Sequence, residues 1–353
     1  MRCPTLSELP PPPADRIGWP WTAEGTRLPN RMNGGSEWPR VSVVTPSFNQ
    51  GAFLEETIRS VLLQGYPDLE YIVIDGGSTD NSVEIIRKYE PWLVYWVSEK
   101  DRGQSDAINK GFKRVTGDII AWLNSDDYYE QGVFRRVIQE FLTNSGHMVV
   151  MGNARAFGMG REYIREETEP QLYPLLFHCP LVQRKMPNVM PCQPAMFFRR
   201  KVVDTLGPLD IHLVYSMDYD YWIRALVEGF RFHHVSQTWA HYRFHPQSKG
   251  SEGPEACYEE WTTVSQKHFN ALPLRKRISA GIWWWKALFV FWYSKTAVGL
   301  SLAKRSEEAL WLLKACRAEY GWPKWKMIAK ACWLAPWQVF GTGTGRPPAG
   351  DEE

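Results

Sequence analysis

The sequence lacks several features that would place it in a simple class of protein. Its formal net charge is only +2, which is too small to make nucleic acid the expected main partner. Its six cysteines are scattered without a C-x-x-C pair, so neither a zinc site nor a disulfide framework is indicated. The Pro-rich N-terminus has no apolar core of the signal-peptide type. These absences favour a reducing, cytoplasmic compartment.

A long uninterrupted apolar run is also missing. The longest apolar stretch, residues 282–302, contains Lys286 and Lys295, so we do not favour a transmembrane helix there. Between residues 274 and 340, twelve Lys and Arg residues outnumber three Glu residues by nine, and Trp and Tyr are frequent. Such side chains favour the membrane–water boundary and anionic headgroups. We expect a helical, basic and aromatic-rich extension over 251–340 in peripheral contact with the cytoplasmic face of a membrane; ordinary helical core packing is the alternative.

Apolar runs that indicate buried strands alternate with amphipathic stretches from Val41 onward. The apolar runs are 41–45, 71–74, 92–97, 119–123 and 148–151. Their alternation with helical patterns indicates right-handed βαβ crossovers and a largely parallel sheet. We therefore expect an α/β domain over residues 39–250. A flexible N-terminal arm at 1–38 should precede it, and a disordered tail at 341–353 should end the chain.

Polar loops follow four of the predicted strands at their carboxyl ends. These loops are 46–49, 75–80, 99–103 and 124–127. Ligands of parallel sheets bind outside this edge, so we expect the loops to form one site. In the last loop, Asp126 and Asp127 offer the hard oxygen ligands that Mg²⁺ or Mn²⁺ prefers, often together with substrate phosphates. A solvated turn that caps the next helix is the alternative.

Other acids in the sequence also suit a ligand site. Asp75 follows a buried strand and precedes glycines, so it could accept hydrogen bonds from a base or ribose while the glycines admit a ligand. The helix start at Asp106 could meet a pyrophosphate. Asp218 and Asp220 open a later helical pattern, and one of them could be a general base. Plain connections and the preference of acids for helix N-termini are the alternatives.

Taken together, these motifs resemble the family-2 glycosyltransferases of the inverting GT-A fold. The segments that carry the resemblance are VSVVTPSFNQ at 41–50, EYIVIDGGSTDNS at 70–82, SEKDRGQSDAINKG at 98–111, GDIIAWLNSDD at 117–127, MDYDYWIRAL at 217–226 and YRFHPQSKG at 242–250. The resemblance implies a Rossmann-like, mostly parallel sheet flanked by helices. It also implies metal-dependent transfer of a sugar from a nucleoside diphosphate, with UDP favoured, to an acceptor hydroxyl in polysaccharide, glycolipid or cell-surface glycan synthesis.

The resemblance further implies a role for each matching position. Asp126 would bind the metal, Mn²⁺ or Mg²⁺, with His245 as a second contact to metal or diphosphate. Asp218 would be the catalytic base, supported by Asp220. The acceptor would be a glycan or lipid-linked molecule. The residues implied to contact the nucleotide sugar are Thr45, Pro46, Asn49, Asp75, Asp106, Asn124 and Ser125.

Three positions depart from the family pattern. Asn124 stands at the first aspartate of D-x-D, Gly76 at the second aspartate of D-D-G-S, and Met217 at the glutamate of E-D. These departures leave the donor sugar open. Two other functions are alternatives: a nucleotide-sugar-binding protein without catalysis, and a sugar nucleotidyltransferase. The second normally has a Gly-rich, basic loop after the first strand, and residues 46–50 contain neither Lys nor Arg.

Overall fold

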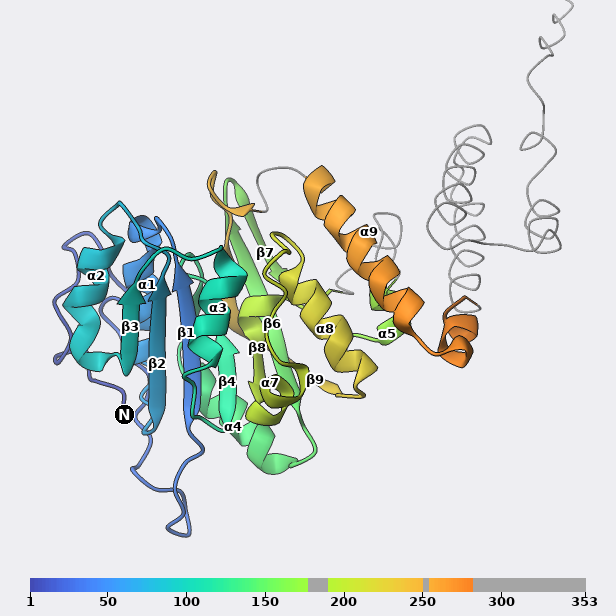
Figure 1. The fold of residues 1–353 in the computed structure, drawn as a ribbon. Helices are drawn as coiled ribbons and strands as arrows, with labels where there is room; N and C mark the ends of the chain where they lie inside the picture. The colour runs from blue at the N-terminus through green and yellow to red at the C-terminus, as the bar shows by residue number, and fades with distance from the viewer. Residues whose placement is uncertain (177–189, 250–253, 282–353) are drawn as a thin grey trace, which may run out of the picture. The chain divides into compact units, whose positions relative to one another are not determined.

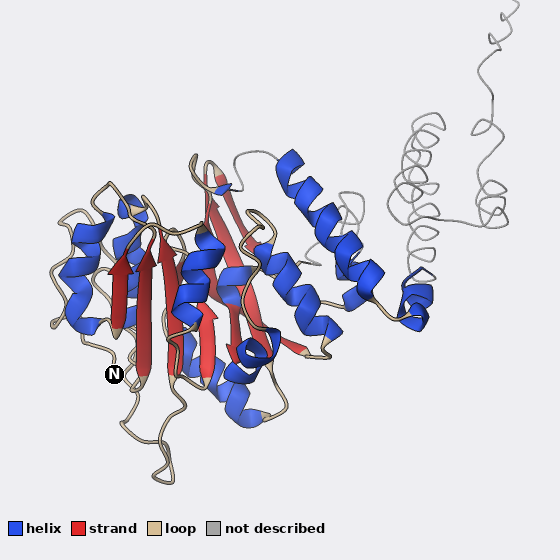
Figure 2. Cartoon of the chain, in the orientation of Figure 1, coloured by secondary structure: helices blue, strands red, loops and turns tan. Residues whose placement is uncertain are grey.

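The computed structural model describes residues 1–176, 190–249 and 254–281. Helices cover both faces of a central sheet, as Figures 1 and 2 show. The chain divides into two compact units, Met1–His268 and Phe269–Glu353. All strands of the described residues belong to the first unit, and the predicted α/β class is confirmed there.

Four parallel strands form one half of the sheet. They are β1 (Val41–Ser47), β2 (Leu69–Asp75), β3 (Tyr95–Ser98) and β4 (Ile119–Trp122), in the order β3-β2-β1-β4. β1 lies between β2 and β4, and its register with β2 runs from Val41↔Leu69 to Ser47↔Asp75. The carboxyl ends of β1 and β2 therefore meet at one edge, where the polar loops follow.

Helices cover this half on both faces because successive strand residues point to opposite sides. The helices are α1 (Gly51–Leu62), α2 (Ser82–Tyr89), α3 (Gln104–Phe112) and α4 (Val133–Thr143), with a 3-10 turn, η1 (Glu90–Trp92), after α2. Val41 and Val43 face a core that includes side chains of α1, α2 and α4. Val44 faces α3, where a Cβ on Gly111 would lie 2.3 Å from Val44 Cγ1. Glycine thus permits the close approach of α3 to β1.

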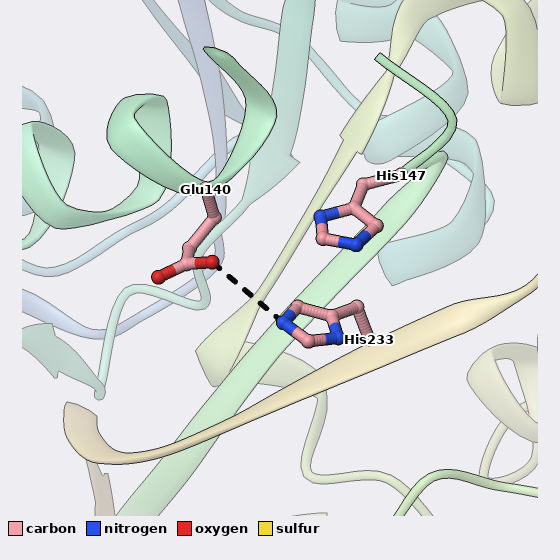
Figure 3. Close-up of side chains that lie close together, drawn as sticks. All are labelled: Glu140, His147 and His233. Carbon is pink, nitrogen blue, oxygen red and sulfur yellow. Dashed lines mark ion pairs between the residues drawn. The ribbon is translucent and has the colours of Figure 1, made fainter. Parts of the chain in front are cut away.

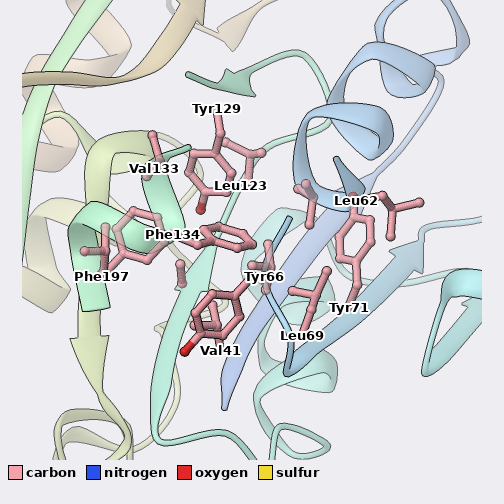
Figure 4. Close-up of a cluster of buried hydrophobic side chains, with 14 of the residues drawn as sticks. Val41, Leu62, Tyr66, Leu69, Tyr71, Leu123, Tyr129, Val133, Phe134 and Phe197 are labelled. Atoms are coloured by element: carbon pink, nitrogen blue, oxygen red, sulfur yellow. The ribbon is translucent and has the colours of Figure 1, made fainter. Parts of the chain in front are cut away.

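Aromatic side chains form much of the core beside α1 and α4 (Figure 4). Tyr66, Tyr129, Phe134 and Phe197 are all buried there. Tyr129 stacks on Phe197 with ring centroids 5.3 Å apart, and Phe134 meets Tyr66 edge to face at 6.1 Å. Large buried rings of this kind contribute strongly to the hydrophobic stabilisation of a core. Burial of Tyr129 also anchors the chain directly after the acidic loop at 124–127.

The second half of the sheet mixes strand directions. Its strands are β5 (Tyr128–Tyr129), β6 (Val149–Gly158), β7 (Arg161–Arg165), β8 (Met196–Arg199) and β9 (Phe232–Arg243). The helices and 3-10 turn of this part of the chain are α5 (Leu172–Leu176), η2 (Gln193–Ala195), α7 (Arg200–Leu206), α8 (Met217–Val227) and α9 (Pro254–Ala271). β8 is antiparallel to β4 and to β6, so β6 and its parallel partner β9 run in the direction of β4. β5 pairs with β9 at Tyr128↔His241, which brings the end of β9 beside the acidic loop.

Residues 1–38 differ from the flexible arm that the sequence predicted. They form no helix or strand, but several of their side chains belong to the core beside α1 and β2. Arg59 of α1 explains this packing, because its buried guanidinium donates hydrogen bonds to the backbone oxygens of Pro10, Pro20 and Trp21 at 2.9–3.1 Å. A buried guanidinium without partners would be costly, and the N-terminal segment supplies the acceptors.

The first compact unit extends beyond the domain boundary expected at residue 250. It runs through His268 and therefore includes most of α9. The carboxylate of Glu260 in α9 accepts hydrogen bonds from the backbone nitrogens of Val214, Tyr215 and Ser216 at 2.8–2.9 Å. These contacts tie α9 to the loop that leads into α8, so α9 is part of the body that carries the site.

Two expectations about the C-terminal extension concern residues that the structure does not describe. The interfacial contacts expected within 282–340 and the disordered tail at 341–353 both lie outside the described residues. Within the part of the chain that is described, no helix combines the length and the apolar character needed to cross a bilayer.

Candidate active site

The polar loops after β1, β2 and β3 contact one another at the carboxyl edge of the sheet. Asn49 accepts a hydrogen bond from the backbone nitrogen of Thr79 at 2.8 Å, and its own backbone nitrogen donates to Ser78 Oγ at 2.8 Å. Asn49 has a φ of 52°, a left-handed conformation that asparagine adopts more readily than most residues. The backbone nitrogen of Glu99 donates to the carbonyl oxygen of Asp75 at 3.0 Å. Hydrogen bonds therefore join the three loops to one another along this edge of the sheet.

Asp75, predicted to accept hydrogen bonds from a base or ribose, is buried at the end of β2. Its carboxylate accepts hydrogen bonds from the backbone nitrogens of Gly77 and Ser78 at 3.1 and 2.9 Å. It also accepts from the hydroxyls of Ser78 and Ser98 at 2.5 and 2.7 Å. Four such contacts use most of the acceptor capacity of a carboxylate. Asp75 thus determines the shape of the loop that would meet the base.

Three more residues predicted to line the nucleotide pocket lie near the carboxyl edge of the sheet. Thr45 and Pro46 are buried in β1, and Thr45 Oγ1 lies 3.1 Å from the hydroxyl of Tyr71. Asp106, in the first turn of α3, accepts a hydrogen bond from Arg102 Nη2 at 3.0 Å. That hydrogen bond holds the pKa of Asp106 below its usual range, so its carboxylate is ionised near neutral pH.

Asp101 occupies the space that the family pattern gives to a second aspartate after Asp75. Gly76 stands at that position, and a Cβ built on it would lie 2.7 Å from Asp101 Oδ2. The backbone nitrogen of Gly103 donates to Asp101 Oδ1 at 2.8 Å. Burial raises the pKa of Asp101, and the negative charge of Asp106 adds to the increase. The next loop therefore places a carboxylate beside Gly76, a neighbour that the sequence motif alone did not indicate.

Asp126 and His245, the predicted metal-binding pair, are 119 residues apart in the sequence and adjacent in the structure. His245 Nε2 lies 3.0 Å from Asp126 Oδ2, and His245 Nδ1 lies 3.2 Å from Gln247 Oε1. The hydrogen bond with Asp126 raises the pKa of His245. The imidazole packs against the ring of Phe53 at a centroid distance of 4.5 Å. The Asp126 carboxylate is an oxygen ligand of the kind that Mn²⁺ or Mg²⁺ prefers, so Asp126 and His245 are the residues that would hold such an ion or its diphosphate.

Asp127 is buried, and its hydrogen bond with Arg243 helps to hold the acidic loop at 124–127 in place. Its Oδ1 accepts a hydrogen bond from the backbone nitrogen of Arg243, and Arg243 Nε donates to the carbonyl oxygen of Asp126, both at 3.0 Å. Ser125, a predicted nucleotide-sugar contact, is also buried; its carbonyl and that of Asp127 accept from Thr57 Oγ1 at 2.9 and 2.6 Å. Burial, and then the charge of Asp126, raises the pKa of Asp127. Sequence reasoning missed the supporting roles of Arg243 and Thr57.

A chain of polar side chains connects the acidic loop to the start of α8. Asn124, which replaces the first aspartate of D-x-D, accepts a hydrogen bond from Gln104 Nε2 at 2.6 Å. Lys249 Nζ donates to Gln104 Oε1 at 2.9 Å and to the carbonyl oxygen of Val214, shortly before α8, at 3.0 Å. Lys249 therefore brings a positive charge into the site. Its position in the YRFHPQSKG motif was the only sequence signal for it.

Asp218, the predicted catalytic base, lies in the first turn of α8 and is half-buried. Its Oδ1 accepts a hydrogen bond from the backbone nitrogen of Tyr219 at 2.8 Å. Burial raises the pKa of Asp218 to about 6, although that hydrogen bond and the positive charges of Arg165 and Lys249 act in the opposite direction. A carboxylate with this pKa is mostly ionised at pH 7 and is basic enough to accept a proton from a reacting hydroxyl.

Asp220 does not support Asp218, contrary to the expectation from sequence. Two residues along an α-helix are rotated by about 200°, so the two side chains leave α8 on nearly opposite sides. Asp220 is buried and accepts hydrogen bonds from Arg224 Nε and His268 Nε2, both at 2.8 Å. Burial alone would raise the pKa of Asp220, but the His268 hydrogen bond and the Arg224 charge hold it below the usual value. Asp220 therefore joins α8 to α9.

Comparison with known proteins identifies the family. A family model described as glycosyl transferase family 2 matches residues 42–207. An uncharacterized glycosyltransferase of Mycobacterium tuberculosis is 33% identical over 191 residues, which cover 53% of this chain and 69% of that protein. The chain belongs to glycosyltransferase family 2. This family-2 glycosyltransferase is also 28% identical over 239 residues to TuaG of Bacillus subtilis, named for teichuronic acid biosynthesis, with 65% of this chain and 90% of TuaG covered.

Solved structures show the same fold for this glycosyltransferase. TarS of S. aureus, in complex with UDP-GlcNAc, aligns with a TM-score of 0.56 and 17% identity over 79% of this chain and 81% of that chain. A longer TarS chain aligns with a TM-score of 0.51, but only 39% of its length is covered. The likeness confirms the GT-A-like sheet flanked by helices. Family membership decides in favour of a transferase over the two alternatives considered from the sequence.

Proposed function

We propose that this glycosyltransferase moves a sugar from a UDP sugar to an acceptor hydroxyl in one displacement, with inversion at the anomeric carbon and with Mn²⁺ or Mg²⁺. The observation that carries the proposal is the half-buried Asp218 carboxylate, with its pKa raised to about 6. Lys249 and Gln104 connect the start of its helix to the loop of Asp126. TarS, solved with UDP and with UDP-GlcNAc, supports this class of donor.

The proposed reaction is a single substitution. Asp218 accepts the proton of the acceptor hydroxyl while the acceptor oxygen bonds to the anomeric carbon. The bond from that carbon to the β-phosphate oxygen breaks at the same time, and UDP leaves with the electron pair. When bound, a divalent ion would supply neutralisation of the charge that develops on the diphosphate, and Asp126 and His245 are the residues that would hold it. Lys249 adds a fixed positive charge to the same site.

Calorimetric titration with UDP and Mn²⁺ tests the donor and the metal together. We expect Asp126→Ala to weaken UDP binding by at least about tenfold, because loss of a group that holds the metal commonly has an effect of this size. EDTA should weaken binding to the wild-type protein similarly. Asp204→Asn, at an exposed acid on α7, is the matched control and should bind UDP normally. Equal binding of all nucleoside diphosphates, unaffected by EDTA, would contradict the proposal.

We further propose that the acceptor is a glycan or lipid-linked glycan at the cytoplasmic face of a membrane, as part of polysaccharide, glycolipid or cell-surface glycan synthesis. The excess of positive charge and the aromatic residues between 274 and 340 support this location. Each basic residue near an anionic surface contributes about 1 kcal/mol, and salt screens the attraction. The full chain should therefore float with anionic liposomes at low salt and less so at high salt. Failure to float at low salt would contradict the proposed location.

A further inference from the structure

Three side chains that commonly bind metals lie together away from the candidate active site. Glu140 is in α4, His147 is in the loop before β6, and His233 is the second residue of β9. Within the described residues, this is the one group of three or more His, Cys, Asp or Glu side chains whose ligand atoms all lie within 4.8 Å of one another. β6 and β9 run in the direction of β4, so their starts lie at the sheet edge opposite the polar loops.

The arrangement of the three side chains is close to a metal site (Figure 3). The two imidazole rings stack with centroids 4.1 Å apart and an interplanar angle of 15°. Glu140 Oε2 lies 3.6 Å from His233 Nε2, which is slightly too long for a hydrogen bond. Ligand atoms about 2.0–2.1 Å from a tetrahedral zinc ion lie roughly 3.3 Å from one another. A small movement of Glu140 or His233 would give this spacing for that pair, and one imidazole would turn out of the stack so that the in-plane lone pairs of both rings point to the ion.

Each histidine has a polar side chain near the ring nitrogen that would not bind the ion. His233 Nδ1 lies 3.6 Å from Glu169 Oε1, on the side of the ring away from Glu140. A carboxylate behind an imidazole is the arrangement that commonly orients a zinc-bound histidine. His147 Nε2 lies 3.1 Å from the side-chain nitrogen of Asn144, while His147 Nδ1 is buried and has no hydrogen-bond partner in the described part of the chain.

The backbone of His147 is held firmly in place. Its carbonyl oxygen accepts a hydrogen bond from Arg199 Nε at 2.9 Å, and its nitrogen donates to the carbonyl oxygen of Asn144 at 3.1 Å. Arg199 Nη2 also donates to the carbonyl oxygen of Phe141 in α4 at 2.8 Å. β8 thus fixes the α4–β6 connection at two points. The fold therefore fixes the backbone that carries His147 beside α4.

We propose that Glu140, His147 and His233 bind a zinc ion, with water as the fourth ligand. Two imidazoles and one carboxylate suit Zn²⁺, whereas Mg²⁺ and Ca²⁺ prefer sites made of oxygen ligands. The ion would join α4 to the starts of β6 and β9, so it would stabilise the fold. Because the site lies at the opposite edge of the sheet, its loss should leave UDP binding unchanged. The sequence showed no sign of the site, because its ligands come from three separate segments.

Zinc binding is best measured by competition with a chromophoric zinc indicator, using the full chain stripped of metal. The measurement should be made in an Asp126→Ala background to remove binding at the candidate active site. We expect one zinc ion per chain, and affinity at least about tenfold lower for His147→Ala, His233→Ala and Glu140→Gln. His212→Ala, at an exposed histidine between α7 and α8, is the control and should keep the affinity of its parent. Excess Mg²⁺ should not compete.

Two further readouts distinguish a zinc site from packing of a stacked histidine pair. Co²⁺ in place of zinc should give visible absorption bands that the His147→Ala and His233→Ala variants lack. Zinc should raise the Tm of the parent protein and not that of Glu140→Gln, a surface substitution that also serves if a histidine variant fails to fold. Unchanged zinc affinity in Glu140→Gln and in the folded histidine variants, or equal competition by Mg²⁺, would overturn the proposal. UDP binding in an Asp126-containing protein tests the proposed function separately.

Discussion

Asp75 and Asp106, beside the polar loops, differ from Asp218 at the start of α8 in how their carboxylates are held. Asp75 accepts four hydrogen bonds from its own loop and from β3, and Asp106 is paired with Arg102. Asp218 lies where burial outweighs the nearby positive charges and raises its pKa to about 6. A carboxylate that is removed from water without enough compensating partners becomes a stronger base. This difference supports the proposal that Asp218 is the base.

The sharpest test of this difference is removal of the base. Asp218→Asn should lower kcat by about 10²-fold or more, because an amide cannot accept the hydroxyl proton at neutral pH. Binding of UDP should stay near the wild-type value, since the donor-side loops are unchanged. Steady-state assays of UDP release, with calorimetry on the same preparation, measure both effects. Near-normal turnover in the folded variant would place the base elsewhere.

Asp220 provides the contrasting substitution on the same helix. Asp220→Asn should lower the free energy of unfolding by about 2 kcal/mol, because a buried ionic hydrogen-bond network loses its acceptor. The pKa of Asp220 is held below its usual value, so its stabilisation is present above the unfolded pKa and disappears as the pH falls through the folded pKa. Urea unfolding of wild type and variant at pH 7 and in acid measures the difference. Unchanged stability with a large loss of kcat would instead make Asp220 the base.

The pH profile tests whether the raised pKa belongs to Asp218. Activity should decrease by about tenfold per pH unit well below pH 6, since only the ionised carboxylate accepts a proton. This decrease forms the acidic limb of the pH profile. The positive charge of Lys249 lowers the pKa of Asp218, so Lys249→Met should move this acidic limb to higher pH. The residual activity of Asp218→Asn should lack the limb. An acidic limb that stays in the Asp218→Asn profile would assign it to another group.

A smaller effect is expected where Asp101 fills the space beside Gly76. Asp101→Ala should weaken UDP binding several-fold, whereas Gly76→Asp should be more damaging because its Cβ would lie 2.7 Å from Asp101 Oδ2. The double variant should bind UDP better than Gly76→Asp alone, since the clash is removed and the local acid is restored. A double-mutant cycle of UDP affinities measures this coupling. If the two substitutions changed the UDP affinity additively, the side chains at positions 76 and 101 would not compete for the same space.

Prediction from the sequence was most successful for the parallel half of the sheet. Strands β1, β2 and β4 appear as short apolar runs, and each is followed by a polar loop at the same edge, because right-handed crossovers return the chain in one direction. In the mixed half, the sequence indicated only the start of β6, as the apolar run 148–151. There β6 pairs with β7, the next strand along the chain, and also with β8 and β9, and nothing local to β6 specifies that these two distant segments lie beside it.

The sequence by itself determined the first strands and the acids that the sheet edge carries, because these depend on local patterns of apolar and polar residues, and its motifs resembled family-2 glycosyltransferases. Only the tertiary structure decided which partner each side chain meets. It placed Asp101 beside Gly76, paired Asp220 with His268, and surrounded Arg59 with the carbonyl oxygens of the N-terminal segment. In each case the partner comes from a separate segment of the chain. Burial then fixes the pairing, because a polar group removed from water needs a partner wherever the fold can provide one.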